Sequence, residues 1–198
     1  MTNNATAKKT LRKIFGDLRK QISTHDKEIL SQAIAKNFFA LLQQQKINYQ
    51  NKIFASYIAT PNEVDPRYID AGLQQHNITI CYPKINNLSL DFIAPNNSQF
   101  QFHHDFKSIL EPIEGTILIP DFLIVPLIGF DKKLNRLGNG KGFYDRAIYN
   151  LKIQNPNLIA IGLAFTNQYY DGIFAYEKHD QSLDYVVTNQ KIFYLESR

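Results

Sequence analysis

A chain of 198 residues with a net charge of +4 and 20% charged residues has the length and composition of one globular domain. No apolar run reaches the roughly 18 residues of a membrane span, and no apolar segment of a secretory signal peptide follows the lysines near the N-terminus. A single cysteine, Cys81, excludes both an intramolecular disulfide and a cysteine-rich zinc site. We therefore expect one cytoplasmic domain, residues 1–198, with no membrane partner.

The N-terminal half predicts two helices followed by a strand, a helix and a second strand. Ser23 opens a capping-box pattern between the two helices, and Asp65-Pro66 has the form of an N-cap followed by a proline at the first helical position. The expected elements are helices at 8–22 and from 24 until the pattern breaks at 46–51, a strand at 52–58, a helix through about residue 75 and a strand at 78–82. A strand, a helix and a strand at this spacing indicate parallel pairing.

The C-terminal half predicts buried strands around a further helix. The continuous apolar run 122–128 is typical of a strand buried on both faces, and Pro126 should stand near its end, because proline cannot serve a central ladder. The other expected elements are an antiparallel strand at 88–93, a polar irregular stretch at 95–108, a helix at 143–153 and strands at 158–165 and 184–188. The pattern predicts a single α/β domain, Rossmann-like, with a mostly parallel sheet and helices on both faces.

The segment 130–146 carries the strongest chemical signal. Gly138, Gly140 and Gly142 stand at alternate positions between a buried strand and a helix, where open α/β sheets bind ligands. Arg136 and Lys141 add positive charge for phosphate oxygens. The spacing fits neither the dinucleotide fingerprint nor a Walker loop. The residues alone therefore predict a generic anion-binding loop, with a turn that only connects strand to helix as the alternative.

This segment resembles the signature of the 5-formyltetrahydrofolate cyclo-ligases, also called 5,10-methenyltetrahydrofolate synthetases. The resemblance covers most of the chain, and its most specific part runs from Arg136 to Arg146. Further matches are Lys8-Lys9-Thr10-Leu11-Arg12, Asn62-Glu63-Val64-Asp65, Tyr82-Pro83-Lys84, Glu111-Pro112, Val125-Pro126, Gly129-Phe130-Asp131, Phe165-Thr166-Asn167-Gln168 and His179-Asp180. The chain departs from the family at Asn139, where an aromatic residue or a cation is frequent, and at Phe143, where tyrosine is usual and a hydroxyl is lost.

The resemblance implies a monomeric enzyme with a fold like that of the NagB, RpiA and CoA-transferase proteins. Its reaction would be the ATP- and magnesium-dependent cyclisation of 5-formyltetrahydrofolate to 5,10-methenyltetrahydrofolate, with release of ADP and phosphate. ATP would phosphorylate the formyl oxygen, the 10-nitrogen would attack, and phosphate would leave. Phosphoryl transfer depends mainly on alignment and charge neutralisation.

The resemblance also implies residue roles. The catalytic candidates are Lys141 and Arg136, and the magnesium candidates are Asp145 and Asp180. The ATP-binding candidates are Lys8, Lys9, Thr10, Leu11, Arg12, Arg136, Leu137, Gly138, Asn139, Gly140, Lys141, Gly142, Phe143 and Tyr144. The substrate-binding candidates are Ile58, Glu63, Asn139, Gly140, Lys141, Gly142 and Phe143.

Structural alternatives stay open for several of these residues. Lys8 and Arg12 could belong to a solvated basic helix face, to which Lys13, Arg19 and Lys20 are assigned. Asp145 could pair with Arg146 or interact with the helix dipole, and Glu63 could be an exposed loop acid. One of Phe143 and Tyr144 is expected in the core. The remaining polar or aromatic groups considered are 103–105 and 169–170, both interpreted as structural, His179, which could cap or pack, and Gln168, a weaker candidate for lining the site.

Two other functional classes are compatible with parts of the pattern. A non-catalytic folate- or nucleotide-binding protein could use the same scaffold, although Arg136, Lys141 and Asp145 are all present. A nucleic-acid-binding module would suit the basic first helix, but no nucleic-acid motif is recognisable and exposed aromatic residues are not interleaved with the cations. We therefore expect 5-formyltetrahydrofolate and ATP as partners, and no nucleic acid.

Overall fold

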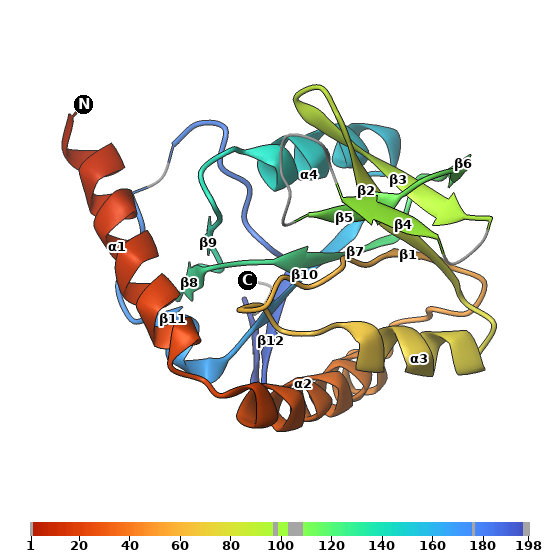
Figure 1. The fold of residues 1–198 in the computed structure, drawn as a ribbon, viewed down its shortest axis with the longest axis horizontal. Helices are drawn as coiled ribbons and strands as arrows, with labels where there is room; N and C mark the ends of the chain where they lie inside the picture. The colour runs from red at the N-terminus through yellow and green to blue at the C-terminus, as the bar shows by residue number, and fades with distance from the viewer. Residues whose placement is uncertain (1, 97–98, 103–108, 176, 196–198) are drawn as a thin grey trace.

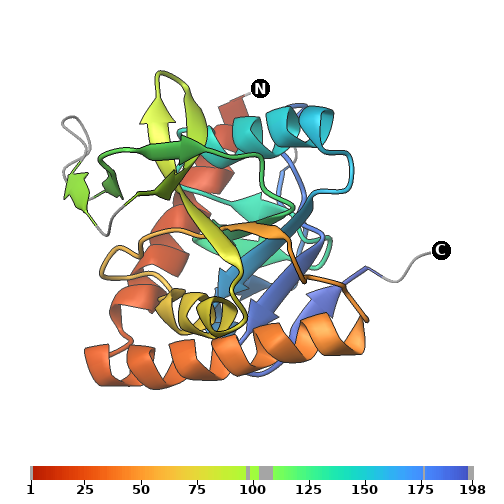
Figure 2. The ribbon, with the colours of Figure 1, turned by 90° about the vertical axis from the view of Figure 1, so that its right-hand side faces the viewer.

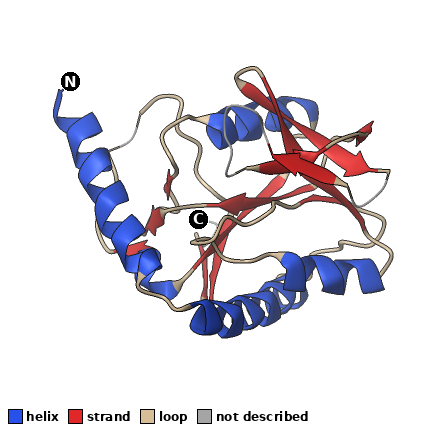
Figure 3. Cartoon of the chain, viewed as in Figure 1, coloured by secondary structure: helices blue, strands red, loops and turns tan. Residues whose placement is uncertain are grey.

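The computed structural model describes residues 2–96, 99–102, 109–175 and 177–195 (Figure 1). The helices are α1 (Thr2–Lys20), α2 (Thr24–Gln44), α3 (Arg67–Gln75), α4 (Phe143–Gln154) and the 3-10 helix η1 (Thr166–Gln168). The strands are β1 (Ile53–Ala55), β2 (Thr79–Asn86), β3 (Ser89–Pro95), β4 (Phe100–Phe102), β5 (Leu110–Pro112), β6 (Gly115–Ile117), β7 (Phe122–Pro126), β8 (Gly129–Asp131), β9 (Arg136–Leu137), β10 (Ile159–Ala164), β11 (Tyr169–Tyr170), β12 (Tyr185–Thr188) and β13 (Ile192–Tyr194). Figure 3 shows how these strands run between the helices.

An eight-stranded sheet in the order β13-β12-β10-β7-β1-β2-β3-β6 forms the centre of the molecule. The five strands from β12 to β2 are parallel, and the antiparallel strands β13, β3 and β6 extend the sheet at its two sides. Helices α2 and α3 cover one face and α4 covers the other (Figure 2). The predicted α/β fold, with a mostly parallel sheet and helices on both faces, is therefore confirmed.

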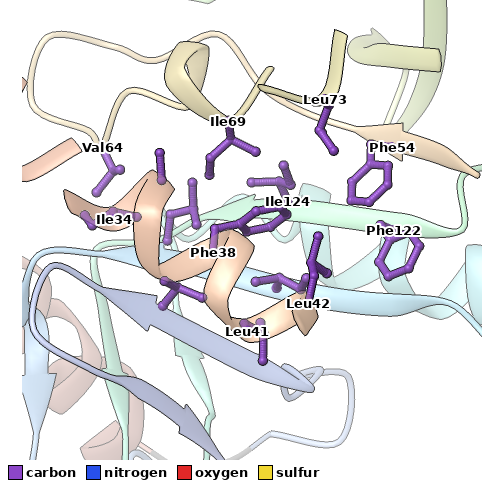
Figure 4. Packing of buried hydrophobic residues seen from close by; sticks show 14 of the residues in the cluster. Ile34, Phe38, Leu41, Leu42, Phe54, Val64, Ile69, Leu73, Phe122 and Ile124 are labelled. Carbon is purple, nitrogen blue, oxygen red and sulfur yellow. The ribbon is translucent and has the colours of Figure 1, made fainter. Parts of the chain in front are cut away.

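Strand β7 shows why the apolar run at its position predicts a doubly buried strand. Phe122 and Ile124 pack in the cluster beneath α2 and α3, whereas Leu123 and Val125 pack in the cluster beneath α4. Figure 4 shows Phe38, Leu41 and Leu42 of α2 turned toward the first cluster. Alternate side chains on a strand point to opposite faces, so each face of β7 contributes to a separate core. As predicted, β7 ends at Pro126.

Helix α1 lies beyond the main sheet, beside β8 and β11 (Figure 1). Its Phe15 packs with Ile128, Leu137 and Phe174 in a third cluster. The approach to β8 is close, because a Cβ atom built on Gly129 would lie 2.7 Å from the Phe15 ring. This packing fixes α1 near the end of β7 and places Arg12, about one turn before Phe15, beside Gly138 of the glycine-rich segment.

Several predicted boundaries are corrected by tertiary pairing. Helix α1 ends at Lys20 rather than 22, and the β1 ladder ends at Ala55, after which the chain leaves the sheet. Strand β2 continues to residue 86 because it forms an antiparallel hairpin with β3, as the predicted antiparallel strand requires. Strand β4 lies inside the stretch predicted to be irregular, where it pairs with β5. No helix of the described residues is both long and apolar enough to cross a membrane.

The start of α3 also differs from the prediction. The helix begins at Arg67, with Pro66 as the preceding capping residue rather than the first helical one. The Asp65 side chain still accepts a hydrogen bond from the backbone N–H of Arg67, at 3.1 Å. Asp65 therefore still accepts a hydrogen bond at the start of the helix, as predicted, although the helix begins one residue later than expected.

A buried carboxyl group on α3 makes the stability of the fold pH-dependent. Asp70 accepts a hydrogen bond from the Tyr82 hydroxyl at 3.0 Å, while its other carboxyl oxygen has no partner among the described residues. Burial raises the pKa of Asp70 to about 6. The folded state thus holds this proton more tightly than the unfolded state, so the free energy of unfolding should fall as the pH rises from about 4 to 6.

Asp70→Asn should remove this loss. We expect the variant to be more stable than the wild type at pH 8, by about 1–3 kcal/mol, and to lose that advantage near pH 4. Urea unfolding at a series of pH values measures the difference. Asp17→Asn, on the exposed face of α1, should leave the pH profile of the wild type unchanged. An Asp70→Asn profile parallel to that of the wild type would contradict the assignment.

Candidate active site

A cleft of about 1000 Å³ opens at the carboxyl ends of the central strands. Its walls come from α1, the segment after β1, the end of β7, and the glycine-rich segment that leads into α4. This is the side of an open α/β sheet where ligands bind, because the strands end there and the loops can present polar groups. The cleft therefore brings together most of the segments singled out in the sequence.

The glycine-rich loop adopts backbone conformations that residues with a side chain rarely take. Gly140 and Gly142 have φ values of 89° and 67°, in the left-handed region that favours glycine. Gly142 is also the capping residue at the start of α4. Two arginines fix the loop: Arg12 Nε donates to the carbonyl of Gly138 at 2.8 Å, and Arg146 Nη2 donates to the carbonyl of Lys141 at 2.8 Å. Lys141 itself is exposed and lines the cleft.

A buried ion pair lies under this loop. Arg136 Nη2 is 2.8 Å from Asp145 Oδ2, and the two side chains are only 5% and 14% exposed. Arg136 also lies over the Tyr144 ring, 5.5 Å from its centroid, and Asp145 Oδ1 accepts a hydrogen bond from the backbone N–H of Gln181 at 3.3 Å. Of the two structural alternatives for Asp145, the pairing with Arg146 is wrong, because Arg136 is the partner.

A second charged group lies at the N-terminal end of α1. Lys8 is 8% exposed, and its Nζ atom lies 2.6 Å from Asp180 Oδ2 and 3.3 Å from Glu177 Oε1. One ligand atom from each of Glu177, His179 and Asp180 falls within 4.8 Å of the others. His179 Nε2 lies 3.2 Å from Glu177 Oε2, so this histidine contacts the acidic group rather than packing in the core. Oxygen atoms of this kind suit a hard cation such as Mg²⁺.

A carboxylate, the buried Tyr57 and the half-buried Tyr144 line another part of the cleft. Glu63 Oε2 accepts a hydrogen bond from the backbone N–H of Thr60 at 2.9 Å, which stabilises the turn between these two residues. Glu63 and Ile58 both line the cleft. The Tyr57 hydroxyl donates to the carbonyl of Val64 at 2.6 Å and holds the same loop from below. Burial first, and the Glu63 charge second, raise the pKa of Tyr57 and of Tyr144 well above its ordinary value, so both phenols are neutral near pH 7.

The structure separates the candidates on α1. Lys8 and Arg12 line the cleft and are not part of a solvated face. Lys9 and Thr10 are exposed and do not line it, while Leu11 packs against the third core cluster. The reason is helical periodicity, because residues three to four positions apart share a face and adjacent ones do not.

The other candidates divide as follows. Within the glycine-rich segment, every residue from 136 to 145 lines the cleft, as do Ile58, Glu63 and Asp180. Phe143 and Tyr144 are both half-buried, and both line the cleft. Gln168 does not line it, because its amide is buried and bonded to the backbone of Leu127 and Ile128. The two tyrosines of β11 pack on aromatic neighbours, as predicted, and 103–105 lie outside the described residues.

Glu177 and Arg19 are among the cleft residues that the sequence does not predict to belong to the site. Glu177 stands three positions before Asp180, and that proximity was the available signal. Arg19 was assigned to the solvated face of α1, yet it lines the cleft and its guanidinium is partly buried. Its position seven residues after Arg12, on the same helical face, was the signal in this case.

A mostly parallel α/β sheet with a cleft of cations, glycine backbone and carboxylates at its strand ends defines an enzyme scaffold suited to phosphorylated ligands. A model of the 5-formyltetrahydrofolate cyclo-ligase family matches residues 4–189, and the chain belongs to this family. The predicted resemblance is thereby confirmed, and membership places the chain among the ligases of folate one-carbon metabolism.

Relatives match over nearly the whole chain. The 5-formyltetrahydrofolate cyclo-ligase of Mycoplasma pneumoniae is 31% identical over 96% of this chain and 100% of its own length, and that of Mycoplasma genitalium is 29% identical over 92% and 98%. Among solved structures, a 5,10-methenyltetrahydrofolate synthetase from M. pneumoniae has a TM-score of 0.72 at 27% identity, covering 92% of this chain and 98% of that one. The Aquifex aeolicus synthetase has a TM-score of 0.78 at 25% identity, covering 96% and 94%.

Proposed function

We propose that the protein converts 5-formyltetrahydrofolate to 5,10-methenyltetrahydrofolate, with ATP and Mg²⁺, and releases ADP and phosphate. One observation carries the proposal: a single cleft joins a cationic and acidic end at Lys8 and Asp180 to a carboxylate end at Glu63, with the glycine-rich loop between them. The first end suits a nucleotide triphosphate with its metal, and the second suits the amino and amide groups of a pterin. We also propose a cytoplasmic, monomeric enzyme.

The nucleotide would be held by α1 and the glycine-rich loop. Lys8 and Arg12 present their charges on the cleft side of the helix, and Arg12 clamps the loop at Gly138. The loop leads into the N-terminus of α4, where backbone N–H groups and the helix dipole favour anions. Lys141, exposed on this loop, would neutralise charge that develops on the transferred phosphoryl group or on the formyl oxygen.

The acidic residues fit magnesium. Mg²⁺ prefers oxygen ligands and commonly takes one or two carboxylates together with substrate phosphates. Asp180 and Asp145 would supply these carboxylates, with Glu177 beside Asp180. In the structure a cation already orients each of the two, Lys8 for Asp180 and Arg136 for Asp145. Bound magnesium would neutralise phosphate charge and so promote phosphoryl transfer.

The reaction needs activation of a poor electrophile. Transfer of the γ-phosphoryl group of ATP to the formyl oxygen breaks the bond to ADP and gives an iminium phosphate. The lone pair of the 10-nitrogen then attacks the formyl carbon, that nitrogen loses its proton, and the carbon–oxygen bond breaks with release of inorganic phosphate. Glu63 and Ile58 would hold the pterin, and Phe143 and Tyr144 would pack against the rings. The residues thus act chiefly by alignment and charge neutralisation.

The test is the near-ultraviolet absorbance of the methenyl product. Purified protein is mixed with 5-formyltetrahydrofolate, ATP and MgCl₂, and each of ATP and MgCl₂ is omitted in turn. We expect a rise in absorbance only in the complete mixture. Binding of folate or ATP by calorimetry without any rise would instead support a non-catalytic binding protein on the same scaffold. If neither ligand bound, the assignment to this cleft would be wrong.

The metal role of Asp180 can be tested separately. Asp180→Asn should raise the magnesium concentration needed for half-maximal rate by about tenfold or more, because an amide oxygen lacks the charge that a hard cation prefers. Magnesium titration of the initial rate measures this. Asp171→Asn is the matched control, since Asp171 is exposed and does not line the cleft. An unchanged titration for Asp180→Asn would count against the metal role.

A further inference from the structure

Arg19 occupies a place on α1 that the proposed function does not yet use. Lys8, Arg12 and Arg19 all line the cleft and follow one another at four and seven residues, which places them on one face of the helix. At about 1.5 Å per residue, Arg19 lies roughly 16 Å along the axis from Lys8. It therefore belongs to the end of the cleft formed by Glu63, away from the end suited to phosphates.

The guanidinium of Arg19 is held in place but incompletely bonded. Nη1 donates to the carbonyl of Leu127 at 3.3 Å, just after the end of β7. Nε is shielded from solvent and has no hydrogen-bond partner among the described residues. An unsatisfied buried donor is costly, and each one in a native protein calls for an explanation. Nη2 is neither among the buried unpaired atoms nor hydrogen-bonded to a described residue, so it is the donor of the anchored guanidinium that remains for a ligand.

Among charged groups, Glu63 has the largest effect on the pKa of Arg19. Burial lowers the pKa of Arg19, and the Glu63 charge acts in the opposite direction. Within the described part of the chain, however, no ion pair of 4.0 Å or less joins Arg19 to a carboxylate. Donor and acceptor therefore line the same cleft without pairing with each other, so both can contact one ligand.

The chemistry of this pair selects a particular kind of ligand edge. A carboxylate accepts from N–H groups and a guanidinium donates to an oxygen, so the pair complements a cyclic amide whose carbonyl stands beside its N–H. A second carboxylate, such as the glutamate tail of a folate, would be repelled by Glu63. In a pterin ring the 4-oxo group stands beside the N3–H and is followed by the 2-amino group, which is the required order.

We infer that Arg19 is a specificity-determining residue that donates a hydrogen bond to the 4-oxo group of the pterin while Glu63 accepts from N3–H and the 2-amino group. This assignment rests on the proposed function, because it takes the substrate to be 5-formyltetrahydrofolate. It predicts that the protein distinguishes a 4-oxo pterin from its 4-amino counterpart, which carries donors where the guanidinium needs an acceptor. A site built around a hydrogen bond rejects an analogue that cannot make it.

The test compares kcat/KM for 5-formyltetrahydrofolate with that for the analogue bearing a 4-amino group. We expect the wild type to prefer the 4-oxo substrate by about 10²-fold or more, and Arg19→Gln to lower that preference by about tenfold or more. Glutamine can turn its amide oxygen toward a 4-amino group, so the loss should come partly from improved use of the analogue. Lys13→Gln, an exposed cation on the same helix, should leave the preference unchanged.

Two results would overturn the specificity role of Arg19. If Arg19 only anchors the Leu127 carbonyl, Arg19→Gln will lower the rates for both substrates equally and keep their ratio. If Arg19 holds the glutamate tail, the defect will vanish with 5-formyltetrahydropteroate, which lacks that tail. An inactive wild type would instead refute the proposed function itself, so the two failures are distinguishable.

Discussion

Lys141→Ala is expected to lower kcat/KM by about 10²–10³-fold while leaving the melting temperature within about 2 °C of the wild type. The side chain is exposed on a loop that lines the cleft, between two glycines in left-handed conformation. The backbone carbonyl of Lys141 accepts a hydrogen bond from Arg146, and an alanine at this position would keep that bond. The loss should therefore fall on the charge that faces the reacting groups. Initial rates from methenyl absorbance and a thermal melt measure the two effects.

A matched lysine tests whether any loop cation would give the same result. Lys132 is exposed in the turn after β8 and does not line the cleft, so Lys132→Ala should retain wild-type kinetics. Lys141→Arg should recover part of the activity, because it restores charge but not the compact ammonium group. Wild-type turnover in Lys141→Ala, with a cooperative melt, would remove Lys141 from the catalytic assignment.

The predictable part of the fold is the part set by local pattern. Helix α2 and strand β7 have long periodic or continuous apolar runs, and the structure has both near the predicted positions. The strands that the sequence does not predict are short: β4, β6 and β13, for example, have three residues each and exist because other segments pair with them. Three residues carry too little periodicity to outweigh tertiary context, so propensity alone cannot locate such strands.

The candidate site divides in a similar way. The glycine-rich segment could be recognised because its loop needs backbone conformations that favour glycine, as the positive φ of Gly140 and Gly142 shows. The partner of Asp145 could not be predicted in this way. Arg146 is its neighbour in sequence, but the actual partner is Arg136, which comes close to Asp145 only when β9 and α4 take their places in the fold. The spacing of Arg19 from Arg12 places both on one helical face, but the burial of Arg19 depends on the end of β7, which lies more than a hundred residues away. Contacts of this kind are properties of the fold rather than of the local sequence.

Arg136→Leu is expected to have the largest effect on stability. It would leave the Asp145 carboxylate buried without its cation, and breaking a buried pair from one side costs about 3–5 kcal/mol. For a chain of this size the melting temperature should fall by roughly 10 °C. Arg67→Leu is the matched control, because it breaks an ion pair with Asp65 in which the arginine is 65% exposed, and it should cost about 1 kcal/mol or less.

The double variant Arg136→Leu/Asp145→Asn decides what the pair does. Removing both charges should restore much of the lost stability, since no unpaired charge remains and asparagine can still accept from the N–H of Gln181. Turnover should stay low, because Arg136 is one of the two catalytic candidates and Asp145 is proposed to bind magnesium. A double variant that regained both stability and wild-type turnover would show that the pair only neutralises itself, and both roles would be withdrawn. Stability without turnover would instead separate the two contributions of these residues, one to the fold and one to the chemistry.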